Sequence, residues 1–413
     1  MIRILDAKDA GRLLERKAVR LGEAELIVRP ILDAVRRRGD RALLEYGRQF
    51  DGLTRKSVVV PVDELKLAER SVSPKFKRAV RAAAKNIRAF AKLQLPIAKR
   101  QQIAPGITAG QVVRPLDVVG AYVPAGRYPL PSTLLMTVIP AQVAGVPTIC
   151  VTSPKAVPEI YAVASLLGVE RVFQIGGAQA IAAFAYGTQS VPRADRIVGP
   201  GNIYVAAAKK LLAGEVGIDF VAGPTEILII AAEGEPRWIA ADMLAQAEHD
   251  TDASAILLTT SRQLAAAVQA EIELQLATLP TAATARVAIN KNSAILLVRS
   301  LEEAADLSNR FAPEHLSLHH PELLPLIRHA GGIFLGAASP EAAGDYAAGP
   351  NHVLPTSGAA RLRGGLSSAD FVKVIATQSL TKRGLRDLSS TITTLARAEG
   401  LEAHARSVEV RLA

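Results

Sequence analysis

Histidine residues recur beside acidic or amide residues in the second half of the chain. Gln246 and His249 are three residues apart in LAQAEHD, so on a helix they share one face and could reach one ion. Glu314 and His315 are adjacent in FAPEHL, directly after a proline, which is typical of a rigid turn that leads into a strand. Such pairs could bind a metal ion or transfer protons.

Two further pairs lie closer to the C-terminus. Asp345 and His352 belong to a loop rich in glycine and proline, GDYAAGPNHVLPTSG. Glu399 precedes His404 by five residues, and Gly400 between them predicts the end of a helix. We expect the remaining histidines to be surface pairs or satisfied core groups: His319, His320 and His329.

The donor types in these pairs favour zinc. Histidine nitrogen combined with carboxylate and amide oxygen suits Zn²⁺, whereas Mg²⁺ and Ca²⁺ prefer oxygen ligands alone. The chain has one cysteine and no HExxH motif, which excludes a cysteine-bound structural zinc and argues against the common design of zinc proteases.

Two glycine-bearing turns could receive a nucleotide. RVFQIGGAQAIAAFAYG predicts a strand, the pair Gly176–Gly177 and a helix, and IVGPGNIYVAAAKK repeats this order with Gly199 and Gly201. A helix N-terminus after such a turn attracts a phosphate. The first segment lacks the GxGxxG pattern and an acidic residue about twenty positions later, so a tight turn that serves packing explains it equally well.

The candidate metal, catalytic and nucleotide residues are predicted to belong to an α/β fold. From about residue 117, strands alternate with helices, which favours parallel sheets. The expected strands form two series, joined near Gly223–Pro224: 118–123, 148–152, 171–175 and 196–198, then 226–231, 254–258, 294–298, 316–318 and 333–335.

The two ends of the chain differ from this pattern. Residues 1 to about 100 are expected to be mainly helical, with one strand at 57–60. From Thr381 onward we expect a long helix and then an extended arm that ends in SVEVRL. The arm has alternating valines and little to pack on, which is typical of a segment that docks on a neighbouring subunit.

The net charge of +10 raises the question of nucleic acid binding. Nine basic residues and no acidic ones lie between Lys75 and Arg100. At helical spacing Phe76, Val80, Ala84, Ile87 and Phe90 or Ala91 form one apolar stripe, which predicts a solvated surface helix with its charges on the other faces. Because no nucleic-acid-binding motif accompanies the charge, we expect no nucleic acid partner.

Other bulk features indicate a cytoplasmic enzyme of two or three domains. The chain has 413 residues, and its longest apolar stretches are strand-sized and too short to span a membrane. MIRILDAKDAGRLLERK is charged throughout, unlike a secretory signal. The single cysteine, Cys150, lies in the apolar run VPTICVT, so we expect a buried strand residue rather than a nucleophile.

Taken together, the motifs resemble the histidinol dehydrogenase family over nearly the whole chain and in family order. The matching segments are VGAYVPAGRYPLPSTLLM, IGGAQAIAAFAYGTQSVPRADRIVGPGNIYVAAAKK, AGPTEILIIA, LAQAEHD, FAPEHL, GDYAAGPNHVLPT and AEGLEAH. The resemblance implies an α/β fold with two Rossmann-like, aldehyde-dehydrogenase-like three-layer α/β/α domains, together with a helical N-terminal region and a C-terminal arm. The corresponding ranges are 1–105 (N-terminal region), 106–222 (NAD-binding domain), 223–355 (zinc and catalytic domain) and 356–413 (arm).

The resemblance also implies roles for individual residues. The zinc ligands would be Gln246, His249 and Asp345, with His404 contributed by the other protomer. Glu314 and His315 match the family's catalytic pair. The positions that match its NAD contacts are Tyr122, Gln179 and Asn202, and those that match its substrate contacts, besides the zinc and catalytic residues, are Thr225, His352 and Glu399.

The implied activity is the last step of histidine biosynthesis in a homodimer. L-Histidinol is oxidised by way of the aldehyde to L-histidine, with two NAD and one zinc ion per subunit. Zinc would hold the amine and imidazole of the substrate. His315 would take the proton of the alcohol, and Glu314 would help water to add to the aldehyde. The C-terminal arm of the partner would complete each site.

Two positions depart from the family pattern, and three alternatives remain open. Ala125 replaces a usual glycine, and Thr225 replaces a common serine but keeps the hydroxyl. The main alternative is a sister dehydrogenase for another polar alcohol, although Glu399 and His352 would then be partly superfluous. A zinc hydrolase that uses Glu314 would leave the glycine-bearing unit without a purpose. A basic nucleic-acid-binding protein would bind DNA with a steep salt dependence.

Overall fold

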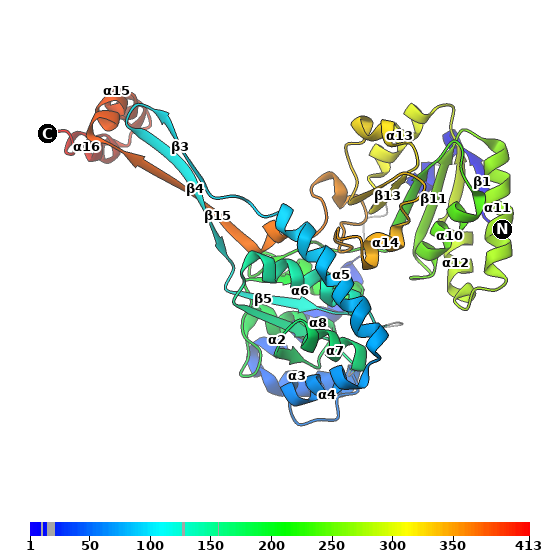
Figure 1. The fold of residues 1–413 in the computed structure, drawn as a ribbon. Coiled ribbons are helices and arrows are strands. Elements are labelled where there is room, and N and C mark those ends of the chain that lie inside the picture. Colours follow the sequence, from blue (N-terminus) through cyan, green and yellow to red (C-terminus); the bar gives the residue numbers. More distant parts are fainter. Residues whose placement is uncertain (10, 15–20, 126–128, 156) are drawn as a thin grey trace.

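The computed structural model describes residues 1–9, 11–14, 21–125, 129–155 and 157–413. Two rounded α/β domains lie side by side, and a narrow arm projects from the first of them (Figure 1). Gly126, Arg127 and Tyr128 of the VPAGRYPLP segment lie outside the described residues, as do parts of the basic segment near the N-terminus.

The first domain is built on a sheet with the order β2-β7-β6-β5-β8-β9. Its neighbours pair in parallel except β2, which runs antiparallel to β7 at one edge. The central strands are apolar on both faces, as parallel strands covered on both sides require. The strands are β2 (Val59–Val60), β5 (Val118–Tyr122), β6 (Thr148–Thr152), β7 (Arg171–Phe173), β8 (Arg196–Val198) and β9 (Gly217–Ile218).

Helices cover both faces of this sheet and make the domain three-layered. One face packs against α2 (Gly22–Arg38), α3 (Asp40–Phe50), α8 (Gly177–Tyr186) and α9 (Ile203–Leu212). The other face packs against α4 (Val62–Ser71), α5 (Pro74–Leu93), α6 (Pro131–Ala144) and α7 (Pro158–Leu166).

The second domain repeats the arrangement with the order β1-β12-β11-β10-β13-β14, all parallel. Its strands are β1 (Arg3–Asp6), β10 (Glu226–Ile230), β11 (Ser254–Thr259), β12 (Ala294–Leu297), β13 (His315–Leu318) and β14 (Gly332–Leu335). One face is covered by α10 (Pro236–Ala247), α11 (Arg262–Leu276) and α12 (Ala282–Asn292), and the other mainly by α13 (Leu301–Phe311) and η2 (Pro321–Leu326). The predicted fold class and both strand series are confirmed.

The first strand corrects the expectation that the N-terminal region is mainly helical with a single strand at 57–60. β1 pairs with β12 in register Arg3 to Ala294, so the chain begins in the second domain and only then enters the first. A four-residue strand among charged residues has too short an alternation to be seen in the sequence. The remaining short helices are η1 (Ala7–Asp9), α1 (Gly11–Leu14), α14 (Glu341–Tyr346), η3 (Ala359–Arg361) and η4 (Ser368–Phe371).

The arm combines two distant parts of the chain. β4 (Ile107–Pro115) pairs antiparallel with β3 (Lys99–Ala104) on one side and with β15 (Val372–Leu380) on the other. Two helices follow at its far end, α15 (Lys382–Ala398) and α16 (Glu402–Glu409). The expected long helix is confirmed, but the expected extended end is wrong: residues 402–409 are helical and pack against α15.

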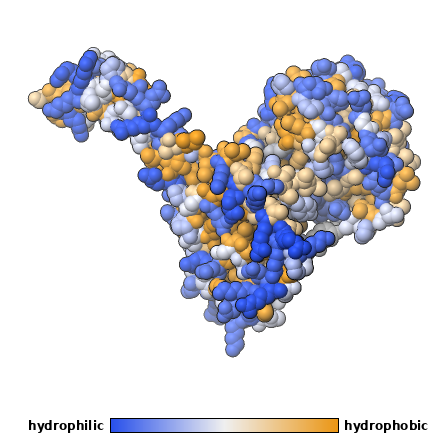
Figure 2. Space-filling view, viewed as in Figure 1, coloured by the Kyte–Doolittle hydropathy of each residue, from blue (hydrophilic) through white to orange (hydrophobic). Residues whose placement is uncertain are grey.

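Two further expectations are confirmed. The basic segment forms α5, which buries Val80, Ala84, Ile87 and Ala91 and leaves most of its charges exposed, so hydrophilic residues cover its outer face (Figure 2). Cys150 is fully buried in β6, and burial raises the pKa of its thiol to about 11. Among the helices of the described ranges, none has the length and apolar character needed to cross a membrane.

Candidate active site

A cavity of about 170 Å³ lies where the two domains face each other. The first domain contributes its carboxyl edge, through the start of α6 and the loop after β8. The second contributes its amino edge, through the residues that precede β10 and begin β13. The lining residues are Leu130, Ser132, Thr133, Pro200, Gly201, Phe220, Ala222, Gly223, Thr225, His249, Glu314, His315, Asp345, Tyr346, His352, Val353, Leu354 and Thr356.

The candidate metal ligands meet at the side of this cavity. Gln246 lies in the last turn of α10, but the helix ends at Ala247, so His249 lies just beyond it rather than on the predicted common helix face. α14 brings Glu341 and Asp345 to the same place, since residues four apart share a helix face. One donor atom each from His249, Glu341 and Asp345 lies within 4.8 Å of the others. This arrangement could hold a cation.

Glu341 is a site residue that the sequence analysis missed. It is buried, and with the amide nitrogen of Gln246 turned toward it, it accepts hydrogen bonds from that nitrogen at 3.0 Å on both carboxylate oxygens. The other end of the Gln246 amide lies 2.5 Å from the Thr225 hydroxyl. The spacing of Glu341 four residues before Asp345 would have been the signal, had the short helix α14 been predicted.

Glu314 and His315 are held rigidly at the amino edge of the second sheet. Glu314 Oε2 accepts hydrogen bonds from the Thr225 hydroxyl at 2.5 Å and from the backbone N–H of Glu226 at 2.9 Å. His315 Nδ1 donates to the Glu226 carbonyl oxygen at 3.2 Å. Its Nε2 is buried without a hydrogen-bond partner among the described residues and lies 3.7 Å from Asp345 Oδ1. The adjacent pair predicted from FAPEHL therefore lies together in the cavity.

The electrostatic environment makes His315 a strong proton acceptor. Burial alone disfavours the imidazolium and lowers its pKa, but the carboxylates of Glu314, Asp345 and Glu341 outweigh burial and raise the pKa of His315 to about 10. For the Glu314 carboxyl, burial raises the pKa, and the charge of His315 and the hydrogen bond from Thr225 oppose this increase. A proton can therefore be held at either member of the pair, which suits acid–base chemistry.

His352 links the two domains across the cavity. Its Nδ1 donates to the backbone oxygen of Asp345 at 2.8 Å, and its Nε2 lies 3.3 Å from the hydroxyl of Thr133 in α6. Burial lowers its pKa, so the neutral imidazole is favoured. The predicted pair of Asp345 and His352 is thus in direct contact.

The three candidate nucleotide contacts lie at or just after the carboxyl ends of strands in the first sheet. Tyr122 ends β5, and its hydroxyl oxygen accepts from the N–H of Gly177 at 3.2 Å. Gln179 lies in the first turn of α8 and is almost fully buried. Asn202 caps α9 and accepts from two N–H groups of its first turn, both at 3.1 Å. This carboxyl edge adjoins the cavity through Pro200 and Gly201, and ligands of α/β sheets bind at such edges.

Glu399 and His404 do not join the cavity of their own chain. Glu399 ends α15 and His404 lies in α16, at the far end of the arm and away from both domains (Figure 1). Both side chains are exposed.

His320 forms a local pair, as expected from the sequence. Its Nδ1 lies 3.1 Å from Glu322, and its Nε2 accepts a hydrogen bond from the N–H of Ala232 at 3.0 Å.

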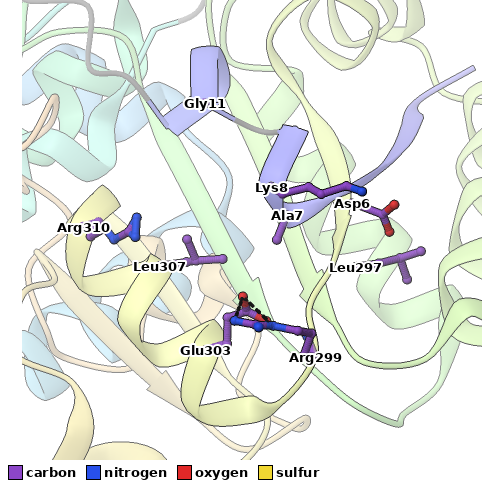
Figure 3. Close-up of a pocket in the computed structure, with 9 residues that line it drawn as sticks. All are labelled: Asp6, Ala7, Lys8, Gly11, Leu297, Arg299, Glu303, Leu307 and Arg310. Carbon is purple, nitrogen blue, oxygen red and sulfur yellow. Dashed lines mark hydrogen bonds and ion pairs between the residues drawn. The ribbon is translucent and has the colours of Figure 1, made fainter.

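A larger hollow of about 800 Å³ lies elsewhere, at the carboxyl ends of β1 and β12. Its polar groups are spread around the rim, with Arg310 on one side and Lys8 and Asp6 on the other, while Arg299 bonds to Glu303 (Figure 3). Polar groups in a ligand site converge, as they do in the smaller cavity between the domains. We therefore place the candidate active site in the smaller cavity.

Comparison with known proteins identifies the family of this chain. The histidinol dehydrogenase family model matches residues 14–412. A histidinol dehydrogenase of Bacillus thuringiensis is 50% identical over 396 residues, covering 93% of this chain and 91% of the relative. One of Syntrophotalea carbinolica is 48% identical, covering 100% and 99%. The crystal structure of histidinol dehydrogenase from Elizabethkingia anophelis superposes with a TM-score of 0.95 at 36% identity, covering 100% of this chain and 98% of that one. With this cavity and this similarity over its whole length, the chain belongs to the histidinol dehydrogenase family.

Proposed function

We propose that the cavity between the two domains is where this oxidoreductase converts L-histidinol, by way of the aldehyde, to L-histidine in histidine biosynthesis. The reaction follows from the family. The observation that supports this location is the convergence of Thr225, Glu314, His315, Asp345 and His352 on one cavity. Production of NADH with L-histidinol as the only substrate tests the reaction itself.

The donors at the cavity fit a zinc ion. Imidazole nitrogen and carboxylate and amide oxygens are a ligand set that Zn²⁺ accepts. We assign Gln246, His249 and Asp345 of one chain to the metal, one ion per subunit, with a further position for His404 of the partner subunit. Glu341, hydrogen-bonded to Gln246, would orient that ligand rather than bind the ion. When bound, zinc would hold the substrate's amine and imidazole as a template.

The carboxyl edge of the first sheet is the proposed NAD site. Tyr122, Gln179 and Asn202 lie around the ends of β5, β7 and β8, and Asn202 directly follows Pro200 and Gly201, which line the cavity. An oxidoreductase of this fold needs an acceptor for the hydride, and NAD supplies it when bound. The position of these residues would direct the nicotinamide end toward the loop of Pro200 and Gly201, which lines the cavity.

His315 is the proposed base for the alcohol. A carbonyl oxygen can only accept, so the bond to the Glu226 carbonyl keeps one proton on Nδ1, and the neutral form of His315 that acts as a base carries its lone pair on Nε2. Nε2 has no other hydrogen-bond partner among the residues described. The imidazole is therefore oriented to take the proton of the substrate hydroxyl.

Glu314 is the proposed base for the second half of the reaction. Its Oε2 is held by Thr225 and by the Glu226 N–H, so the carboxylate cannot rotate away from the cavity. There it would take a proton from the water that adds to the aldehyde. Thr225 and His352, together with Glu399 of the partner subunit, would hold the polar groups of the substrate.

The arm supports a shared site in a homodimer. Few side chains of the helices α15 and α16 are buried, and the apolar side chains of Val374, Ile375, Leu395 and Val410 in the arm are 47–69% exposed. Exposed apolar residues on a projecting element indicate a partner surface. We propose that the arm crosses to a second copy of the chain and brings His404 to its zinc site.

Subunit exchange between two inactive variants, His249→Asn and His404→Asn, tests this proposal. In a mixed dimer, one site collects both substitutions and the other has neither. A random equal mixture contains half mixed dimers with one intact site of two, so activity should recover to roughly a quarter of wild type. If both residues served the same chain's site, every site would keep one substitution, and mixing would restore nothing.

A further inference from the structure

Asp51 lies against the proposed NAD site although it comes from the helical part of the chain that precedes the strands of the first domain. It follows the last residue of α3, and its backbone N–H is bonded to the carbonyl oxygen of Gly47 at 3.0 Å. The carboxylate is partly buried beside the turn between β7 and α8. This position is more than 120 residues away in sequence from the turn that it contacts.

One oxygen of Asp51 holds two groups of that turn. Oδ2 accepts from the N–H of Gly176 at 2.9 Å and from Nε2 of Gln179 at 3.0 Å. The next N–H, of Gly177, donates to the Tyr122 hydroxyl. The start of α8 is therefore capped by side chains of this chain, and a nucleotide phosphate would have to displace them to bind there.

The contact decides which end of the Gln179 amide is free. With Nε2 turned to Asp51, Oε1 lies over Gly177, where an added Cβ would meet it at 2.8 Å. Gly177 has a φ of +57°, so a side chain there would also be strained. No donor to Oε1 is assigned among the described residues. Gln179 thus presents a hydrogen-bond acceptor, which matches a hydroxyl group such as those of a nucleotide ribose.

We propose that Asp51 is a positioning residue for the dinucleotide: it acts by orienting the Gln179 amide, without being required for the acid–base steps. The inference rests on the proposed contact of Gln179 with NAD. On this proposal, the glycine pair Gly176–Gly177 allows close packing of the turn against the side chains of Asp51, Gln179 and Tyr122, and it does not bind a phosphate.

A double-mutant cycle on the zinc-loaded enzyme tests the proposal, with NAD affinity measured by calorimetry. Asp51→Ala should weaken NAD binding roughly ten-fold, as expected when a charged hydrogen-bond acceptor is removed. Asp51→Asn can keep an oxygen at the same point and should lose only about three-fold. In the Gln179→Ala background, neither substitution should weaken binding further. L-Histidinol affinity and zinc content should match the wild type in every variant.

The control is Asp63→Ala, which removes an exposed carboxylate from the same N-terminal region and should leave NAD affinity unchanged. If Gln179→Ala binds NAD like the wild type, the proposed NAD contact itself is wrong. If Gln179→Ala weakens binding while the Asp51 variants do not, or if the losses add, Asp51 does not act through Gln179. Should Asp51→Ala fail to fold, the loss in Asp51→Asn and its disappearance in the Gln179→Ala background decide the question.

Discussion

Lys209 and Asp219 form a buried ion pair behind the loop that contains Asn202. Their side chains are 3% and 1% exposed, and Nζ lies 2.7 Å from Oδ1. Nζ also donates to the carbonyl oxygen of Gly199, and Asp219 Oδ2 accepts from the N–H of Gly199, both within 2.7 Å. The pair therefore fixes the first glycine of the VGPGN loop.

Replacing Lys209 by Met should destabilise the first domain strongly. The substitution keeps the length of the side chain but leaves the Asp219 carboxylate buried without its counter-charge. Breaking a buried pair in this way costs about 3–5 kcal/mol. The double variant Lys209→Met/Asp219→Asn removes the uncompensated charge and should recover part of the loss.

Urea unfolding of the metal-free protein, followed by circular dichroism, measures the effect. Lys291→Met is the matched control: its partner Asp252 lies 3.0 Å away, but these side chains are 60% and 59% exposed, so the loss should be at most about 1 kcal/mol. NAD affinity should fall in Lys209→Met, since the loop of Asn202 is released. If Lys209→Met costs no more stability than Lys291→Met, burial does not strengthen this pair as we argue.

Three other predictions concern the second domain. His249→Asn should stay folded and bind far less zinc, and metal analysis that finds a full complement would remove His249 from the site. Glu314→Gln should form one NADH per site rapidly and the second about two to four orders of magnitude more slowly; equal slowing of both hydride transfers in a rapid-quench experiment would contradict separate roles for Glu314 and His315. Burial raises the pKa of Asp242 to about 6, so the folded state retains a proton that the unfolded state releases, and stability falls as the pH rises from about 4 to 6. Asp242→Asn should therefore be more stable than wild type at pH 8 and equal to it at pH 4 in the metal-free protein, and a difference independent of pH would refute the assignment.

The local elements could be predicted from the sequence because their signals are local. The apolar strands that make both sheets, the basic helix α5 and the buried Cys150 follow from periodicity over a few residues. The proximity of Gln246 to His249 and of Glu314 to His315 follows from spacing alone. The order of the motifs along the chain was also sufficient to predict the family.

Only the tertiary structure brings the separate motifs together. The pairing of β1 with β12, and of β15 with β4, joins segments more than 250 residues apart, and no local pattern encodes such partners. Glu341 and Asp51 become visible as site neighbours for the same reason: each is an ordinary acidic residue until folding buries it beside a glutamine. The cavity itself exists because the carboxyl edge of one sheet faces the amino edge of another, which depends on the packing of whole domains rather than on any residue's propensity.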